Sequence, residues 1–191
     1  WMVGFLVVAP FLLPQEAFLS SLCVTFAGAV YPTGLLGALV AIREARGPGV
    51  DALEAFWLVL LTFFLVWATD IFAYYAGRSL GQRPLAPQIS PNKTWEGSIG
   101  GAVAAVAVAV GFKLTVLSTL GWMDVAVLAV LGGAVSQTGD LAESQLKRST
   151  GTKDASSILP GHGGLFDRFD AMIVAAPLIY LYLRYGAGVI G

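Results

Sequence analysis

The chain has 191 residues, of which 57% are hydrophobic and only 12% are charged. A soluble domain carries about 25% charged residues, and the mean hydropathy of this chain is +0.76, so most of its surface is expected to face lipid. The net charge of −1 gives no basic field of the kind that binds nucleic acid, and we predict no nucleic-acid partner. The single cysteine, Cys23, excludes an internal disulfide.

Six apolar segments follow one another along the chain and are predicted to be membrane-spanning helices. A spanning helix needs about 20 apolar residues, and an open sheet cannot pair its backbone polar groups in lipid. The second segment contains Pro32 and Gly34, which favour a kink or a break. We therefore expect an all-α, polytopic integral membrane protein with a single membrane-embedded domain over residues 1–191. The six segments are residues 1–13, 17–42, 53–76, 95–117, 122–146 and 169–185.

The chain begins at Trp1, inside an apolar run. Neither the basic start nor the small-residue cleavage site of a signal peptide is present. We expect that this first helix is incomplete and that N-terminal helices are missing.

Two long polar connections, residues 77–94 and 147–168, are predicted to lie on the same side of the membrane because single crossings separate them. They hold seven of the 11 lysine and arginine residues, and the opposite ends hold four. Short cytoplasmic loops are enriched in these residues. We therefore expect both connections, and any site that they form, to face the cytoplasm from the cell membrane.

Small residues recur in the fourth and fifth segments, at a spacing that lets helices approach closely in lipid. We interpret them as packing positions that shape a site without contacting a ligand. They are Gly97, Gly100, Gly101, Gly132, Gly133, Ser136 and Gly139.

Acidic side chains gather at the segment ends that face the two polar connections. Acidic residues in apolar segments are costly and are functional candidates by default. Asp140 lies eighteen residues after Trp122, about 27 Å along a helix and therefore near the edge of the hydrocarbon. Asp70 is interpreted either as a ligand or as the partner of a nearby cation, and Glu96 and Asp170 equally as interfacial charges or as site residues. One helix face carries the polar stripe Ser136, Asp140, Glu143, Ser144 and Lys147.

The stretch SQLKRSTGTKDASSILPGHGGLFDRFD, residues 144–170, suits a polyphosphate ligand. Its glycines can expose backbone N–H groups as an anion-binding nest. Asp140 and Asp167 bracket the stretch and can share a divalent cation; oxygen ligands favour magnesium. No GxxxxGK[ST] motif is present, so the chain has no P-loop. The cations of the stretch are Lys147, Arg148, Lys153 and Arg168.

This stretch resembles the signature of the phosphatidate cytidylyltransferase family, with no departure over its 27 residues. Asp70 with the following FAYYAGRSLG, and SPNKTWEG at residues 90–97, resemble the same family. The resemblance covers residues 70–170 with motifs, whereas residues 1–60 match only as apolar helices.

The resemblance implies a dimeric membrane enzyme, with one catalytic domain, that joins phosphatidate and CTP into CDP-diacylglycerol and releases pyrophosphate. It implies that Asp140 and Asp167 are the metal ligands, and that a second cation such as K⁺ accompanies Mg²⁺. Since the phosphate nucleophile is already ionised near neutral pH, no general base is required. Metal ions and fixed cations would offset the repulsion between the two anions.

The predicted catalytic residues are Asp140, Asp167, Lys147 and Arg168. His162 is interpreted equally as a phosphate contact or a structural residue, and Asp154 as a nucleotide contact or an ion-pair partner. Three roles remain open for Ser144: it binds the metal, it binds substrate, or it forms a hydrogen bond with the backbone of its own helix. The predicted substrate-binding residues are Asp70, Ser90, Asn92, Lys93, Glu143, Ser144, Arg148, Lys153, Asp154, His162, Gly163 and Gly164, with Pro91 expected to start a turn or short helix.

Two competing interpretations remain at this point. An ether-lipid cytidylyltransferase or a CTP-dependent polyprenol kinase would use similar residues, and a lipid-swap assay separates these enzymes. A transporter or channel would also carry intramembrane acids, but it predicts charges near the midplane of the membrane. Labelled CTP incorporated into lipid would distinguish an enzyme from a transporter.

Overall fold

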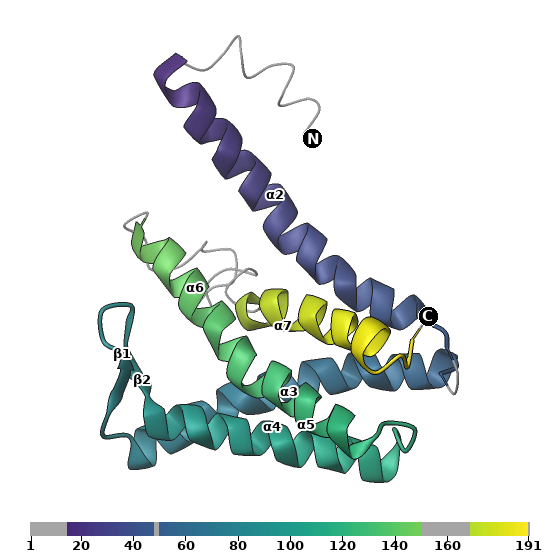
Figure 1. Cartoon of the computed structure of the whole chain (residues 1–191). Helices are drawn as coiled ribbons and strands as arrows, with labels where there is room; N and C mark the ends of the chain where they lie inside the picture. The colour runs from purple at the N-terminus through teal and green to yellow at the C-terminus, as the bar shows by residue number, and fades with distance from the viewer. Residues whose placement is uncertain (1–14, 48–49, 150–168, 191) are drawn as a thin grey trace, which may run out of the picture.

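A computed structural model describes residues 15–47, 50–149 and 169–190, which are mostly helical (Figure 1). The predicted segments at 53–76, 95–117 and 122–146 correspond to three candidate membrane spans in the described part of the chain, Ala52–Leu80, Trp95–Thr115 and Trp122–Ser149. The elements in chain order are α2 (Gln15–Glu44), α3 (Ala52–Leu80), β1 (Pro84–Ala86), β2 (Ser90–Thr94), α4 (Trp95–Thr115), α5 (Trp122–Val130), η1 (Leu131–Val135), α6 (Ser136–Ser149), α7 (Asp170–Leu181) and η3 (Tyr182–Gly186).

The other three predicted segments, residues 1–13, 17–42 and 169–185, do not each correspond to one candidate span. Residues 17–42 fall within α2, which continues through Pro32 and Gly34, so the helix is not broken there and the predicted kink stays a prediction. A proline removes one backbone hydrogen bond, and the helical turns on either side hold a 30-residue helix together. Of the segment 169–185, all but Phe169, the N-cap of α7, falls within α7 and η3. Residues 1–13 lie outside the described residues.

The all-α expectation missed a small antiparallel hairpin in the first polar connection. Strand β1 pairs with β2 in the register Pro84↔Thr94 and Ala86↔Ser90, with an irregularity between them. Pro91 therefore lies in a strand and does not start a helix, which corrects the prediction. A two-stranded hairpin has only edge strands, where a missing N–H is tolerated.

Capping side chains fix where two of the spans begin. Asp51 accepts hydrogen bonds from the backbone N–H groups of Leu53 and Glu54 at 2.8 and 2.9 Å, and these bonds lower the pKa of its exposed carboxyl. Thr94, the last residue of β2, accepts from the N–H of Gly97 at 3.2 Å. The hairpin is thereby joined directly to the first turn of α4.

Helices α3 and α4 pack closely through glycines, as the sequence predicted. A Cβ at Gly97 would lie 2.7 Å from the carbonyl oxygen of Ala73, and one at Gly101 would lie 2.7 Å from that of Thr69. Because these positions lack side chains, the two backbones approach closely, which confirms their role in packing. That they do not contact a ligand stays a prediction, and Gly97 lines the pocket described below.

The third span is interrupted by the wide turn η1 between α5 and α6. Its carbonyl oxygens are satisfied by side chains: Ser136 Oγ donates to Gly133 at 3.0 Å, Gln137 Nε2 donates to Gly133 at 3.1 Å, and Thr69 Oγ1 donates to Gly132 at 3.3 Å. Wide turns of this kind change the direction in which the following residues face. Here the turn η1 sets the rotation of α6 about its own axis, and α6 carries the polar stripe.

Helix α7 packs against α2 on one side and α6 on the other, and its core residues Met172, Ile173 and Ile179 are buried (Figure 1). Gly139 of α6 lies at this contact. A Cβ there would lie 3.0 Å from the carbonyl oxygen of Asp170 and from the Cβ and Cγ2 atoms of Val174. The close approach brings the polar stripe of α6 beside the first turn of α7.

Candidate active site

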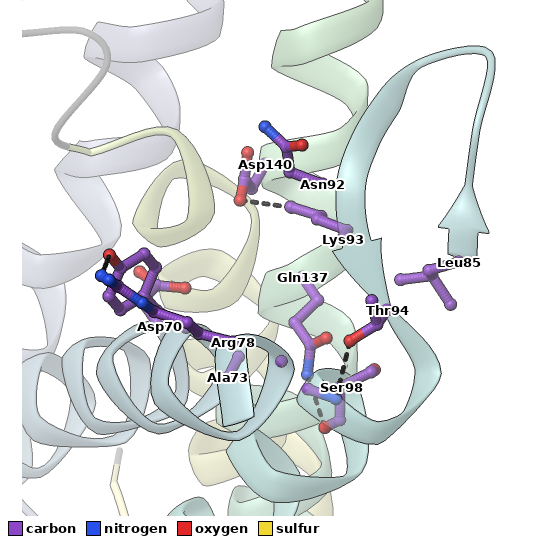
Figure 2. A pocket seen from close by; sticks show the side chains of 13 residues that line it. Asp70, Ala73, Arg78, Leu85, Asn92, Lys93, Thr94, Ser98, Gln137 and Asp140 are labelled. Carbon is purple, nitrogen blue, oxygen red and sulfur yellow. Dashed lines mark hydrogen bonds and ion pairs between the residues drawn. The ribbon is translucent and has the colours of Figure 1, made fainter. Parts of the chain in front are cut away.

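A pocket of about 440 Å³ opens where the end of α3, the hairpin, the start of α4 and α6 meet (Figure 2). It contains two carboxylates and two cations from elements far apart in the sequence. The lining residues are Asp70, Ala73, Tyr74, Gly77, Arg78, Leu85, Asn92, Lys93, Thr94, Gly97, Ser98, Gln137 and Asp140.

An ion pair joins two walls of this pocket. Lys93 Nζ of β2 donates to Asp140 Oδ2 of α6, and both side chains are partly exposed (Figure 2). The hairpin presents Lys93 because Thr94 anchors the end of β2 to α4. The other oxygen of Asp140 receives a weak contact from Ser144 Oγ at 3.5 Å.

A buried amide fixes α6 against α4. Gln137 is 7% exposed, and its Nε2 donates to the carbonyl oxygens of Ser98 at 3.2 Å and Gly133 at 3.1 Å. Since Gln137 precedes Asp140 by about one turn, these bonds hold the orientation of the carboxylate.

Asp140 also belongs to a cluster of three carboxylates. One oxygen each of Asp140, Glu143 and Asp170 lies within 4.8 Å of the others. Asp140 and Glu143 come from α6, and Asp170 opens α7, where it accepts from the N–H of Ala171 at 2.6 Å. The approach of α6 to α7 at Gly139 makes this cluster possible.

Two lysines partly neutralise the cluster. Lys147 Nζ lies 2.7 Å from Glu143 Oε2, whose side chain is fully buried, and Lys93 pairs with Asp140. Asp170 has no lysine or arginine partner in the described part of the chain. Among the side chains that the structure describes, three carboxylates face two ammonium groups, and carboxylate oxygens are the ligand type that Mg²⁺ prefers. The donor set therefore fits a divalent cation.

A sequence model described as the cytidylyltransferase family matches residues 1–186. The chain belongs to the cytidylyltransferase family. The predicted family is thereby confirmed.

Curated relatives agree with this assignment. The phosphatidate cytidylyltransferase of Brucella abortus biovar 1 (strain 9-941) is 53% identical over 127 residues, 66% of this chain and 47% of the relative. The protein of that name in Haemophilus influenzae (strain Rd) is 42% identical over 137 residues, 69% of this chain and 48% of the relative. That of Bacillus subtilis (strain 168) is 44% identical over 119 residues, 62% of this chain and 44% of the relative. The chain spans about half the length of these relatives.

Several predicted site residues of this cytidylyltransferase chain are described by the structure. Asp70, Asn92 and Lys93 line the pocket with Asp140. Ser90 begins β2 but does not line the pocket, and Arg148 is exposed near the end of α6. The predicted residues that lie outside the described part of the chain are Lys153, Asp154, His162, Gly163, Gly164, Asp167 and Arg168.

The predicted Asp140–Asp167 metal pair stays a prediction, because Asp167 is among the residues not described. Sequence reasoning did not assign Asp170 to a metal, although it lies three residues after Asp167 at the start of a helix. Glu96 is a structural residue: its Oε2 accepts from the N–H groups of Gln82 and Arg83 at 3.1 and 3.2 Å. The pocket residues Tyr74, Arg78 and Gln137 were also missed as candidates.

Proposed function

We propose that the protein is a phosphatidate cytidylyltransferase, which joins CTP and phosphatidate to form CDP-diacylglycerol and pyrophosphate. Family membership and the names of the relatives support this reaction. The single structural observation that carries it is the carboxylate cluster of Asp140, Glu143 and Asp170, whose oxygens lie within 4.8 Å of one another beside two lysines. A cation held by these carboxylates, together with the two lysines, would offset the repulsion between two phosphate anions.

The reaction forms a bond between a phosphatidate phosphate oxygen and the α-phosphorus of CTP. The bond from that phosphorus to the oxygen bridging to the β-phosphate breaks, and pyrophosphate carries away the electron pair. Since the attacking phosphate is already ionised, the side chains are required to position two anions and offset their charge, not to remove a proton.

We assign Asp140, Glu143 and Asp170 to a divalent cation, with Asp167 as a further ligand. Mg²⁺ bound there would supply charge neutralisation for the reacting phosphates. The proposal includes a second cation such as K⁺. Lys147 and Arg168 are assigned to the leaving phosphates, and Arg148 and Lys153 to CTP.

We further propose that the protein spans the cell membrane about six times as one catalytic domain, with the site on the cytoplasmic side, and that it forms a homodimer. Three candidate spans support membrane insertion. The excess of lysine and arginine in the two long connections supports the orientation.

The test is an incubation of the purified protein with labelled CTP, phosphatidate and Mg²⁺, with and without a chelator. We expect labelled lipid only when the metal is present, and a loss of at least about 100-fold in Asp140→Asn and Asp170→Asn. The matched control is Asp124→Asn, which changes a carboxylate at the opposite end of the same span. Labelled lipid at equal rates in all three variants would remove the metal assignment, and no labelled lipid from the unmodified protein would remove the function.

A further inference from the structure

Asp140 divides the site into two parts. On one side it meets Glu143 and Asp170 in the carboxylate cluster. On the other side it lines the pocket, which neither of those two residues lines. A reaction between two phosphate compounds needs two neighbouring sites for phosphate, and the pocket together with a cation held by the carboxylate cluster would provide them.

The pocket contains an arginine that the proposed mechanism has not used. Arg78 lies in the last turn of α3, and its Nη1 donates to Tyr74 Oη at 3.0 Å. Both residues line the pocket. Among the described residues Arg78 has no carboxylate partner, and one hydrogen bond leaves the other guanidinium N–H groups for a ligand.

The position of this arginine matches the depth of a lipid headgroup. Arg78 is near the end of the candidate span Ala52–Leu80. Large apolar and aromatic side chains are exposed on the same helix and on the adjacent one: Tyr74 and Tyr75 on α3 are 58% and 65% exposed, and Ile99 on α4 is 61% exposed. Exposed aromatic residues at span ends sit at the level of the headgroups. A lipid phosphate can reach Arg78 while its acyl chains stay beside α3 and α4.

The carboxylates of the pocket limit where a phosphate can bind. Asp70 lies about two turns before Arg78 on α3 and faces the same pocket as Asp140 (Figure 2). A phosphate is repelled from these two carboxylates and attracted to Arg78, the arginine that lines the same pocket. Lys93 of β2 also lines the pocket, but its ammonium group is paired with Asp140.

We infer that Arg78, oriented by Tyr74, binds the phosphomonoester of the lipid substrate and determines the affinity for it. The reacting phosphates of CTP then occupy the side of Asp140 that carries Glu143 and Asp170. This inference rests on the proposed function and assigns the pocket to one of its two substrates. Because CTP also carries phosphate, the test must separate the two.

The first experiment compares Arg78→Gln with Arg78→Lys and Tyr74→Phe in mixed micelles. The KM for phosphatidate is measured at saturating CTP, and the KM for CTP at saturating phosphatidate. We expect Arg78→Gln to raise the KM for phosphatidate at least about tenfold, since a charge-assisted hydrogen bond is lost. Arg78→Lys and Tyr74→Phe should give smaller increases, and the KM for CTP should change less than about twofold in all three variants.

Arg83→Gln is the matched control, because Arg83 is an exposed arginine close in sequence that does not line the pocket. It should leave both KM values unchanged. An increase in the KM for CTP without a change for phosphatidate would assign Arg78 to the nucleotide and overturn the inference. Unchanged KM values for both substrates in Arg78→Gln would overturn it as well.

The second experiment measures binding without catalysis, by calorimetric titration of the purified protein with a short-chain phosphatidate. We expect binding to the unmodified protein and to Arg83→Gln, at least about tenfold weaker binding to Arg78→Gln, and no binding of a short-chain phosphatidylcholine. Thermal unfolding of each variant checks that it is folded. Arg78-dependent binding by a protein that never turns over CTP would reject the proposed function and keep the subsite. If the unmodified protein turns over CTP, and Arg78→Gln and Arg83→Gln bind short-chain phosphatidate equally well, the subsite is rejected and the proposed function is kept.

Discussion

Gly139 offers a sensitive test of how the two helices create the carboxylate cluster. In Gly139→Ala the added Cβ would lie 3.0 Å from the carbonyl oxygen of Asp170 and from two atoms of Val174. An ordinary contact is 3.4 Å or more, so α6 and α7 must separate by a few tenths of an ångström or the side chains must shift. Asp140, the next residue, would then move relative to Asp170.

Such a displacement affects a magnesium site more than it affects folding. Mg²⁺ requires ligands at about 2.0–2.1 Å in nearly octahedral geometry, and a misplacement of about 1 Å costs on the order of 100-fold in rate. We therefore expect Gly139→Ala to lower turnover by about 10- to 100-fold and to raise the Mg²⁺ concentration needed for half-maximal activity. The overpacking should cost about 1–3 kcal/mol of stability.

The assay measures CDP-lipid formation across a Mg²⁺ titration, together with thermal unfolding. Gly111→Ala is the matched control, because a Cβ at Gly111 of α4 meets nothing within 4 Å. It should have unchanged turnover and metal dependence. If Gly139→Ala also kept full turnover at low Mg²⁺, the close approach of α6 and α7 would not set the geometry of the cluster.

Three further predictions concern the elements that hold the site. Thr94→Ala removes the cap of α4 and should lower stability by about 1 kcal/mol, seen as a lower unfolding temperature, whereas Thr94→Ser should retain most of it. Gln137→Leu removes the side-chain donor to the carbonyl oxygen of Ser98 and one of the two side-chain donors to that of Gly133, and should cost about 1–3 kcal/mol; an unfolding temperature equal to that of the unmodified protein would reject this role. The capped carboxylate of Asp51 has a pKa below its ordinary value of 3.8, so its contribution to stability is present above pH 3.8 and is lost as the pH falls through the lowered pKa. Asp51→Asn keeps the capping side chain without the charge. As the pH falls from 3.8 through the lowered pKa, the unmodified protein should therefore lose stability relative to the variant, and a difference in unfolding temperature that stays constant over this range would contradict this.

The helices of the described chain followed from the sequence because hydropathy and length determine them locally. Residues 95–117 and 122–146 were predicted close to the bounds of the corresponding spans. The wide turn η1 was not predicted, since it depends on which side chains reach the carbonyl oxygens of Gly132 and Gly133. The hairpin was missed because its strands are short and Pro91 favoured another interpretation.

The site could be predicted only in part from the sequence. The polar stripe on one helix face identified Asp140 and Glu143, because helical periodicity places them together. Asp170 joined the cluster through the packing of α7 on α6, which the sequence does not specify beyond Gly139. The pair of Lys93 with Asp140 joins residues 47 positions apart, and it depends on how the hairpin is anchored to α4.

The most direct test of the central proposal is equilibrium binding of Mn²⁺, followed by electron paramagnetic resonance in the absence of both substrates. Mn²⁺ accepts the same oxygen ligands as Mg²⁺, so binding reports on the cluster without requiring turnover. We predict a bound ion in the unmodified protein and in Asp124→Asn, and affinity reduced at least about tenfold in Asp140→Asn and Asp170→Asn. Equal Mn²⁺ affinity in all four proteins would contradict the proposal that these carboxylates hold the catalytic cation.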